Sequence, residues 1–181
     1  MKVKIITAAL VTITIFTAKQ SNAQDFPHAG IYVHALYGTA LDKSSKNLYD
    51  NGIGATGGFT YGKNDTRFVG SVGYVAFNSA LAPGDPNFDG YGDKTYIPVR
   101  IGLRQYLPSL LNFLFIQGDA GAGFVSYKSN PANETHFAFD IGAGTQFGPF
   151  EAALMWDSFT EKHPDGWSSW LTIQVGIDLG L

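Results

Sequence analysis

The chain has 181 residues and a formal net charge of -3, with the charged residues dispersed along its length. So small and dispersed a charge does not indicate a nucleic-acid partner. The chain has no cysteine, which excludes a disulfide framework and a lipid-anchored N-terminal cysteine. The stability of the fold must therefore come from backbone pairing and side-chain packing.

The first residues have the three parts of a secretory signal peptide. Lys2 and Lys4 precede an apolar run over residues 5–18, and Ser21-Asn22-Ala23 forms a small-x-Ala cleavage site. A membrane-spanning helix would need about 20 apolar residues, but Lys19 and Gln20 interrupt the run. We therefore expect residues 1–23 to be a cleaved signal peptide and residues 24–181 to form one domain.

This domain contains eight segments in which apolar and polar residues alternate, as they do in β-strands. In the last, Leu171, Ile173, Val175, Ile177 and Leu179 share one parity, and the other parity is polar or small. Each segment is at least as long as the roughly 9–11 residues that a tilted strand needs to cross a bilayer. The predicted strands cover residues 30–39, 52–62, 66–78, 95–107, 113–127, 135–147, 149–158 and 170–181.

The connections between these segments alternate in length. The long ones are 40–51, 79–94, 128–134 and 159–169, and the short ones are 63–65, 108–112 and 148–149. Long external loops and short periplasmic turns are typical of up-and-down outer-membrane barrels. The sequence therefore predicts an all-β, eight-stranded, antiparallel, up-and-down transmembrane β-barrel with both chain ends on the periplasmic side.

Alternation alone also fits a soluble lipocalin-like barrel, in which the apolar face lines a ligand cavity. Two features favour the membrane barrel: many of the 22 glycines lie on the polar parity, where a narrow lumen needs small residues, and aromatic residues gather towards strand ends. Pro98 would remove a ladder hydrogen bond in mid-sheet, so we expect it at the rim of the barrel.

The C-terminal segment resembles the insertion signal of bacterial outer-membrane barrels in Gln174, Gly176, Leu179 and Leu181, although that family usually ends in an aromatic residue. The whole mature chain resembles the small OmpA-like and OmpX-like barrels, without a peptidoglycan-binding domain. This resemblance implies a monomer in the bacterial outer membrane. Its expected partners are membrane lipids, lipopolysaccharide and, during biogenesis, the barrel insertion machinery.

The four histidines, His28, His34, His136 and His163, could in principle serve a lipid A-modifying enzyme of similar fold. Such an enzyme must present its nucleophile at the outer leaflet. The outward parity there carries Ile, Val, Ala, Phe, Leu and Trp without a Ser-His arrangement. We therefore expect no catalytic site and no enzymatic activity.

One long connection has a partial calcium-binding pattern. Asp85, Asn87 and Asp89 place oxygen ligands at positions one, three and five, and Gly90 allows the sharp turn at position six. The twelfth position is Tyr96 and not a bidentate Glu. The same residues are typical of an ordinary external turn, so both interpretations remain open and no other cofactor is expected.

Seven charged residues share the inward parity, and we expect them to form a lumen charge network: Arg67, Arg100, Arg104, Asp119, Asp140, Glu151 and Asp178. Strand directions place Arg67, Arg104, Glu151 and Asp178 near the periplasmic end. They place Arg100 and Asp119 near the middle on adjacent strands, where we expect the two to be partners. An eight-stranded barrel is just wide enough for its side chains to fill, and buried charges are normally paired.

The sequence therefore predicts a plugged barrel with a structural or surface-interaction role and with its external loops as the contact surface. The alternatives are a narrow pore for small solutes, a lipid A-modifying enzyme and a soluble lipocalin-like binding protein.

Overall fold

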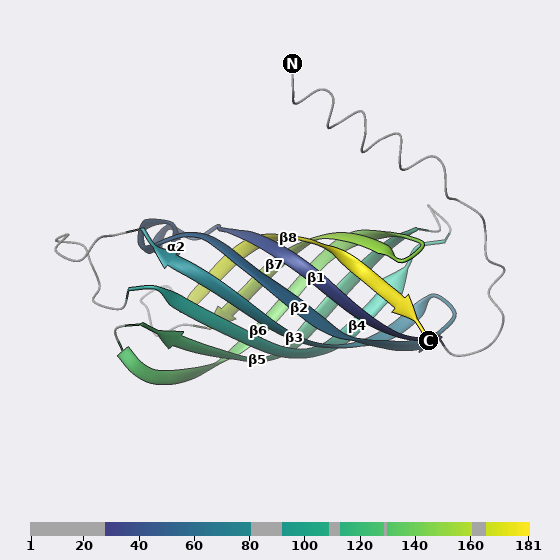
Figure 1. The fold of residues 1–181 in the computed structure, drawn as a ribbon, viewed down its shortest axis with the longest axis horizontal. Coiled ribbons are helices and arrows are strands. Elements are labelled where there is room, and N and C mark those ends of the chain that lie inside the picture. The colour runs from purple at the N-terminus through teal and green to yellow at the C-terminus, as the bar shows by residue number, and fades with distance from the viewer. Residues whose placement is uncertain (1–27, 81–91, 109–112, 129, 161–165) are drawn as a thin grey trace, which may run out of the picture.

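The computed structural model describes residues 28–80, 92–108, 113–128, 130–160 and 166–181. Eight strands pair antiparallel in chain order and the last pairs with the first, so the sheet closes into a barrel and confirms the predicted fold (Figure 1). The strands are β1 (His28–Ala40), β2 (Tyr49–Lys63), β3 (Thr66–Ser79), β4 (Lys94–Tyr106), β5 (Leu114–Tyr127), β6 (Asn130–Phe147), β7 (Phe150–Thr160) and β8 (Trp167–Gly180).

The apolar parity of the strands faces outward. Ile101 on β4 is 61% exposed and Ile173 on β8 is 54% exposed, whereas Thr172, next to Ile173 in the chain, is 5% exposed and faces the lumen. A lipocalin-like barrel would have the reverse arrangement, because its ligand cavity is lined by the apolar face. The outer surface is therefore the apolar band that a lipid-facing barrel needs.

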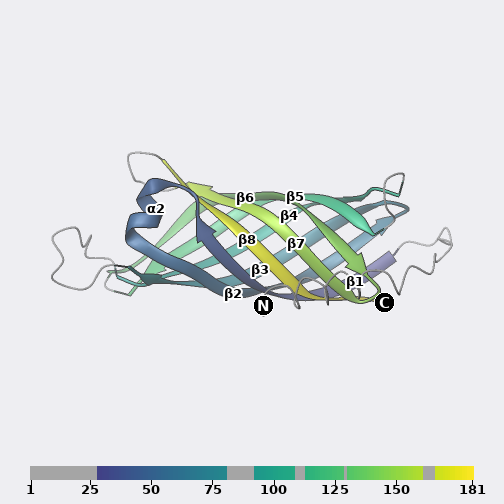
Figure 2. The same ribbon diagram turned by 90° about the horizontal axis from the view of Figure 1, so that it is seen from above.

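The two ends of the barrel differ. We call the end that carries the connections 41–48, 80–93, 128–129 and 161–166 the loop end, and the opposite end the turn end. The strand β1 begins and β8 ends at the turn end (Figures 1 and 2). Both tight turns there have a residue at positive φ, Asn64 at 57° and Gly148 at 58°, a conformation that these residue types adopt readily.

A short helix, α2 (Lys43–Leu48), lies at the loop end (Figure 2). Asp42 caps the helix by accepting a hydrogen bond from the Ser45 backbone N–H at 2.7 Å, and its other carboxylate oxygen accepts one from the Ser169 N–H at 2.8 Å. The Ser45 and Ser168 hydroxyls are also hydrogen-bonded. These contacts attach α2 to β8. None of the described residues forms a helix long and apolar enough to cross a membrane.

One predicted loop is instead part of a strand. The sequence suggested a long connection over 128–134, but β6 already begins at Asn130 and pairs back to Tyr127, with a register shift between Val125 and Tyr127. The β5–β6 hairpin is extended by residues such as Asn133, Glu134 and Thr135 that lack an apolar face. Periodicity cannot identify a strand segment of this kind, because both of its faces are polar.

Pro98 does not lie at the rim, as the sequence suggested, but within β4 and facing the lumen. The pairing of β3 with β4 runs from Thr66 to Val72 and resumes at Val75, so the ladder is interrupted opposite Pro98. A Cβ on Gly73 would lie 3.0 Å from the Pro98 ring. The barrel therefore tolerates the missing N–H through a local break in pairing and a small neighbour.

Candidate functional site

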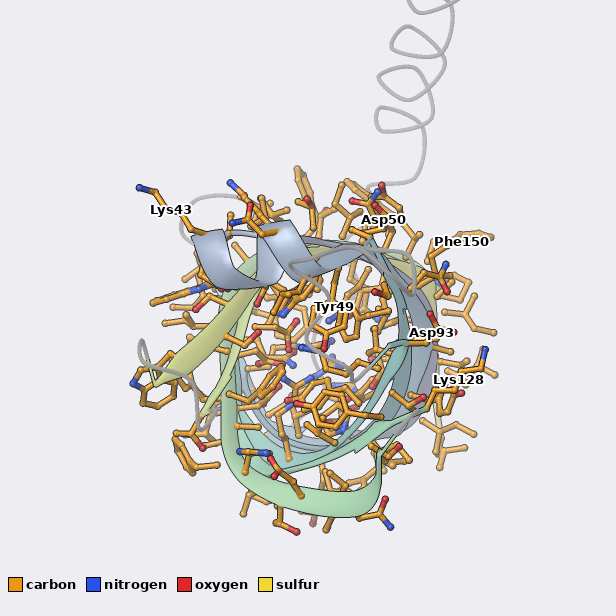
Figure 3. All side chains as sticks on the ribbon, turned by 90° about the vertical axis from the view of Figure 1, so that its left-hand side faces the viewer. Lys43, Tyr49, Asp50, Asp93, Lys128 and Phe150 are labelled. Carbon is orange, nitrogen blue, oxygen red and sulfur yellow. The ribbon has the colours of Figure 1, made fainter. Side chains whose placement is uncertain are left out.

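The lumen is filled in layers, and the layer nearest the loop end is aromatic. The Lys94 side chain is 1% exposed and its ammonium lies inside a cage of rings, 4.2 Å from the centroid of Tyr49 and 5.1 Å from that of Phe159. Phe77 and Trp170 complete the cage. Viewed from the loop end, Tyr49 lies inside the ring of strands (Figure 3). Cation–π attraction compensates a cation held in such a site.

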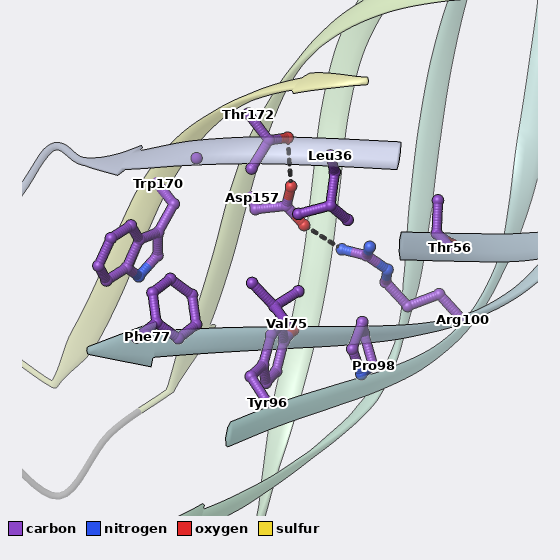
Figure 4. Close-up of a pocket in the computed structure, with 11 residues that line it drawn as sticks. Leu36, Thr56, Val75, Phe77, Tyr96, Pro98, Arg100, Asp157, Trp170 and Thr172 are labelled. Atoms are coloured by element: carbon purple, nitrogen blue, oxygen red, sulfur yellow. Dashed lines mark hydrogen bonds and ion pairs between the residues drawn. The ribbon is translucent and has the colours of Figure 1, made fainter. Parts of the chain in front are cut away.

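The middle layer is built around Arg100. Its Nη1 lies 2.7 Å from Asp140 Oδ2. The same nitrogen forms an ion pair with Asp157, which accepts a further hydrogen bond from the Thr172 hydroxyl at 2.7 Å (Figure 4). Arg100 thus forms its ion pairs with Asp140 and Asp157 rather than with Asp119, the partner that strand adjacency suggested. The register explains this result, because Arg100 lies opposite Gly121.

Asp119 also lies in the middle layer, but its hydrogen-bond partner is Gln117 and not Arg100. It lies opposite Gly102, and a Cβ at that glycine would lie 2.0 Å from Asp119 Oδ1, so only glycine leaves room for the carboxyl group. Its Oδ2 accepts a hydrogen bond from Gln117 Nε2 at 2.6 Å. The Gln117 side chain in turn accepts from Arg104 Nε at 2.8 Å, which connects the middle layer with the one below it.

The layer towards the turn end brings together the remaining four residues of the predicted network. Arg104 donates two hydrogen bonds to Glu151, at 2.6 and 2.8 Å, and its Nη1 lies 3.6 Å from Asp178 Oδ2. Arg67 is more loosely held: its Nη1 lies 3.9 Å from Asp178 and its guanidinium stacks over the Tyr106 ring at 4.5 Å. Every charge in this layer has an opposite charge within 4 Å.

The space left between the aromatic and middle layers is small. A cavity of about 20 Å³ lies there, lined by groups that include Tyr96, Arg100, Asp157 and Trp170 (Figure 4). A volume of this size holds about one water molecule. A second cavity, of about 250 Å³, lies at the turn end and is lined by His28, Arg67, Gln146 and Asp178. The described part of the lumen is therefore packed between a shallow vestibule and the loop end.

The base of the 80–93 connection is held by Asp93. Its Oδ1 accepts a hydrogen bond from the Ser79 backbone N–H at 3.1 Å, and its Oδ2 accepts one from Lys128 Nζ at 3.2 Å. These interactions lower the pKa of the Asp93 carboxyl below its usual value, the Ser79 hydrogen bond first and Lys128 second. Figure 3 labels Asp93 and Lys128 at the same side of the loop end.

Two charged residues of the lumen were missed by the sequence reasoning. Asp157 shares the inward parity of Glu151 on β7, and Lys94 shares that of Arg100 on β4, so parity could have identified both. Asp157 was overlooked because it lies near the expected strand end, and Lys94 because it was assigned to a loop. The calcium-pattern residues Asp85, Asn87 and Asp89 lie outside the described residues.

The histidines do not gather at one place. His34 Nε2 lies 3.4 Å from Glu151 in the lumen, His136 Nε2 lies 3.1 Å from Glu134, and His28 lines the vestibule at the turn end. His163 lies outside the described residues. His34 and His136 thus each lie beside a carboxylate within the barrel wall or lumen.

The residues of the predicted insertion signal lie on both faces of β8. Gln174 and Gly176 face the lumen, Leu179 is 46% exposed on the outer surface, and Leu181 follows the end of the strand. A Cβ on Gly176 would lie 2.0 Å from the Val33 carbonyl oxygen of β1. The glycine therefore permits the close approach of β8 to β1 that closes the barrel.

Solved structures with the same architecture exist. Outer membrane protein Ail of Yersinia pestis, determined in a phospholipid bilayer nanodisc, matches with a TM-score of 0.54 and 20% identity over 85% of this chain and 100% of that chain. The chain has the fold of a small outer-membrane β-barrel. Neisserial surface protein A (NspA) matches with a TM-score of 0.52 and 9% identity over 88% of this chain and 99% of that chain. No protein-family model and no curated protein sequence matches the chain.

Proposed function

We propose that this protein is a closed, non-conducting barrel of the bacterial outer membrane that presents its loop end to the exterior as a contact surface. The packing of the lumen carries the proposal. An aromatic cage and two ionic layers follow one another between the loop end and the vestibule, and the cavity between the first two layers has room for about one water molecule. A pore for small solutes would need a continuous water-filled path.

The apolar outer surface and the strand order support this location. Outer-membrane lipids and lipopolysaccharide would cover the apolar band. The signal peptide over 1–23 would direct export, and the barrel insertion machinery would then recognise Gln174, Gly176, Leu179 and Leu181. In this orientation the turn end faces the periplasm. We further propose that the barrel is a monomer without enzymatic activity.

Cell fractionation combined with gel mobility before and after heating tests the location. We expect the protein in the outer-membrane fraction and a faster-migrating folded form that heating converts to the unfolded one. A protein that is recovered from the soluble periplasm would refute a membrane barrel.

Recordings on purified, refolded protein in planar bilayers test the closed lumen. We expect no steady current, while a porin of known conductance recorded in the same bilayers shows that the measurement detects pores. Steady currents proportional to salt concentration would refute the closed barrel and favour the pore.

The contact role of the loop end requires a variant that leaves the barrel intact. Replacement of residues 81–91 by a Gly-Ser segment of the same length should reduce the aggregation or surface adhesion of cells that display the protein. The matched control replaces residues 109–112 in a turn-end connection. Equal adhesion and aggregation of wild type and both variants, with equal amounts of folded barrel at the surface, would refute a contact role for this connection.

A further inference from the structure

Three carboxylates lie side by side in the middle layer of the lumen. Asp119 on β5 pairs in register with Asp140 on β6, and Asp140 pairs with Asp157 on β7. The three residues are 5%, 4% and 7% exposed. Carboxylates so close together and so well removed from water repel each other strongly. Only the Arg100 guanidinium forms ion pairs with this row in the described structure.

The hydrogen bonds of these carboxylates leave two oxygens unaccounted for. Asp157 is satisfied by Arg100 and Thr172, Asp140 Oδ2 by Arg100, and Asp119 Oδ2 by Gln117. Asp119 Oδ1 and Asp140 Oδ1 are both fully buried and find no donor among the described groups. A buried acceptor without a partner costs about 1–3 kcal/mol. Two buried donors of this layer, Arg100 Nε and Tyr96 Oη, are also without a partner and bond to neither oxygen, so the two acceptors lack a donor placed between them.

Asp119 and Asp140 lie directly opposite each other in the β5–β6 ladder and on the same lumen face, so their carboxyl groups are neighbours. Two ionised carboxylates cannot hydrogen-bond, because neither carries a donor. A single proton on one of them would supply the missing donor. It would also remove one of the two adjacent negative charges.

The net charge of the lumen also favours a bound proton. The three layers described above hold four basic and five acidic side chains, Arg67, Arg100, Arg104 and Lys94 against Asp119, Asp140, Asp157, Glu151 and Asp178, while Glu134 lies nearer the loop end beside His136. One additional positive charge makes the lumen neutral. A buried net charge is costly.

The other groups that act on the pair do not replace that charge. Tyr32 from β1 and Tyr96 from β4 are phenols near the row and carry no positive charge. Arg104 interacts with Asp119 only at longer range, because its guanidinium is bound to Glu151. Thr172 from β8 donates to Asp157.

We propose that Asp119 and Asp140 form a proton-binding site inside the barrel, in which one proton is shared between the two carboxyl groups at neutral pH. The proton completes the hydrogen bonding of the middle layer and cancels the excess negative charge of the lumen. Loss of this proton in alkaline solution leaves two ionised carboxylates in contact and loosens the layer. A metal ion is a poorer occupant, because no group of three or more metal-binding side chains with suitable geometry exists among the described residues.

Infrared spectroscopy of the refolded barrel tests the site directly, because a protonated carboxyl group absorbs separately from an ionised one. We expect the wild type to show a protonated-carboxyl band at neutral pH that is lost in strongly alkaline buffer. Asp119→Asn and Asp140→Asn should each abolish this band, since the neutral amide makes the proton unnecessary. Asp178→Asn, at a carboxylate of the turn-end layer, is the matched control and should retain it.

The wild-type spectrum alone can overturn the proposal, even if a variant fails to fold. Absence of a protonated-carboxyl band from wild type at neutral pH, or its persistence in Asp140→Asn and Asp119→Asn, would show that this pair does not hold a proton. A wild-type barrel that loses stability when sodium is replaced by N-methylglucamine would instead indicate a bound metal cation and would also overturn it. A proton at Asp119 and Asp140 does not depend on the role of the loop end.

Discussion

Arg104 and Glu151 join two strands that are not neighbours in the barrel, β4 and β7, through a pair of parallel hydrogen bonds across the lumen. Arg104 Nη1 lies 2.6 Å from Glu151 Oε2, and Nη2 lies 2.8 Å from Oε1. Both side chains are 1% exposed, and the guanidinium also stacks on Phe115 at 4.1 Å. This bidentate geometry is the strongest form of the ion pair, because both donors of the guanidinium edge are used.

Removal of one partner of this pair should therefore be costly. Arg104→Ala leaves Glu151 as an uncompensated buried charge, so we expect a loss of about 3–5 kcal/mol in the free energy of unfolding, measured by urea unfolding in lipid vesicles. Arg104→Met combined with Glu151→Gln should recover much of the loss. Arg67→Ala is the control and should cost less, because Arg67 is partly exposed and lies 3.9 Å from its partner. Equal losses for Arg104→Ala and Arg67→Ala would contradict the structure.

The pairing of Arg100 can be tested by a double-mutant cycle. Arg100→Ala should also cost about 3–5 kcal/mol if the middle layer is dry. The cycle of Arg100→Ala with Asp157→Ala should show a coupling energy of about 0.5–3 kcal/mol, the range found for contacting residues. The cycle with Asp119→Ala should show a smaller coupling. A larger coupling to Asp119 than to Asp157 would restore the partner that strand adjacency suggested.

Strand parity was sufficient to predict the fold and the direction of most side chains. The alternation in 170–181 placed Ile173 outside and Thr172 inside, as in the structure. In 66–78 the alternation is less regular, because Val69, Val75 and Phe77 fall on the polar parity. All three are buried in the lumen: Val75 and Phe77 belong to the apolar cluster of the loop-end half, and Val69 lies nearer the turn end.

The pairing of charges could not be predicted in the same way. Parity gives the face of the sheet on which a residue lies, but an arginine side chain is long enough to cross a narrow lumen. Arg100 on β4 reaches Asp157 on β7, and Arg104, also on β4, reaches Glu151 on β7. Which carboxylate each guanidinium meets depends on the shear and tilt of the closed barrel, and these are not visible in any single strand.

Ile173 is exposed on the outer face. A charged residue on this face should therefore lower the free energy of unfolding by an amount that depends on its depth in the membrane. Ile173→Arg, near the middle of β8, should reduce the free energy of unfolding in lipid by about 2–4 kcal/mol, whereas Leu179→Arg, on the same face near the turn end, should cost about 0–1 kcal/mol. Urea unfolding of the two variants in phospholipid vesicles measures both. If both variants unfold at the same urea concentration as wild type, the outer face of β8 does not contact the hydrocarbon core.

Acid should loosen the base of the 80–93 connection through Asp93. The folded state lowers the pKa of this carboxyl because the ionised form accepts hydrogen bonds from the Ser79 N–H and from Lys128. A carboxyl whose pKa is lower in the folded than in the unfolded state contributes stability above its ordinary value of 3.8, and this contribution is lost as the pH falls through the lower folded value. Cleavage of the connection by pepsin should therefore accelerate below about pH 4 in wild type relative to an unstructured reference peptide. Asp93→Asn, which keeps one acceptor oxygen but cannot ionise, should show a much weaker dependence. A wild type whose relative cleavage rate stays constant through this range, or an Asp93→Asn variant with the same pH profile, would show that Asp93 does not fix the connection.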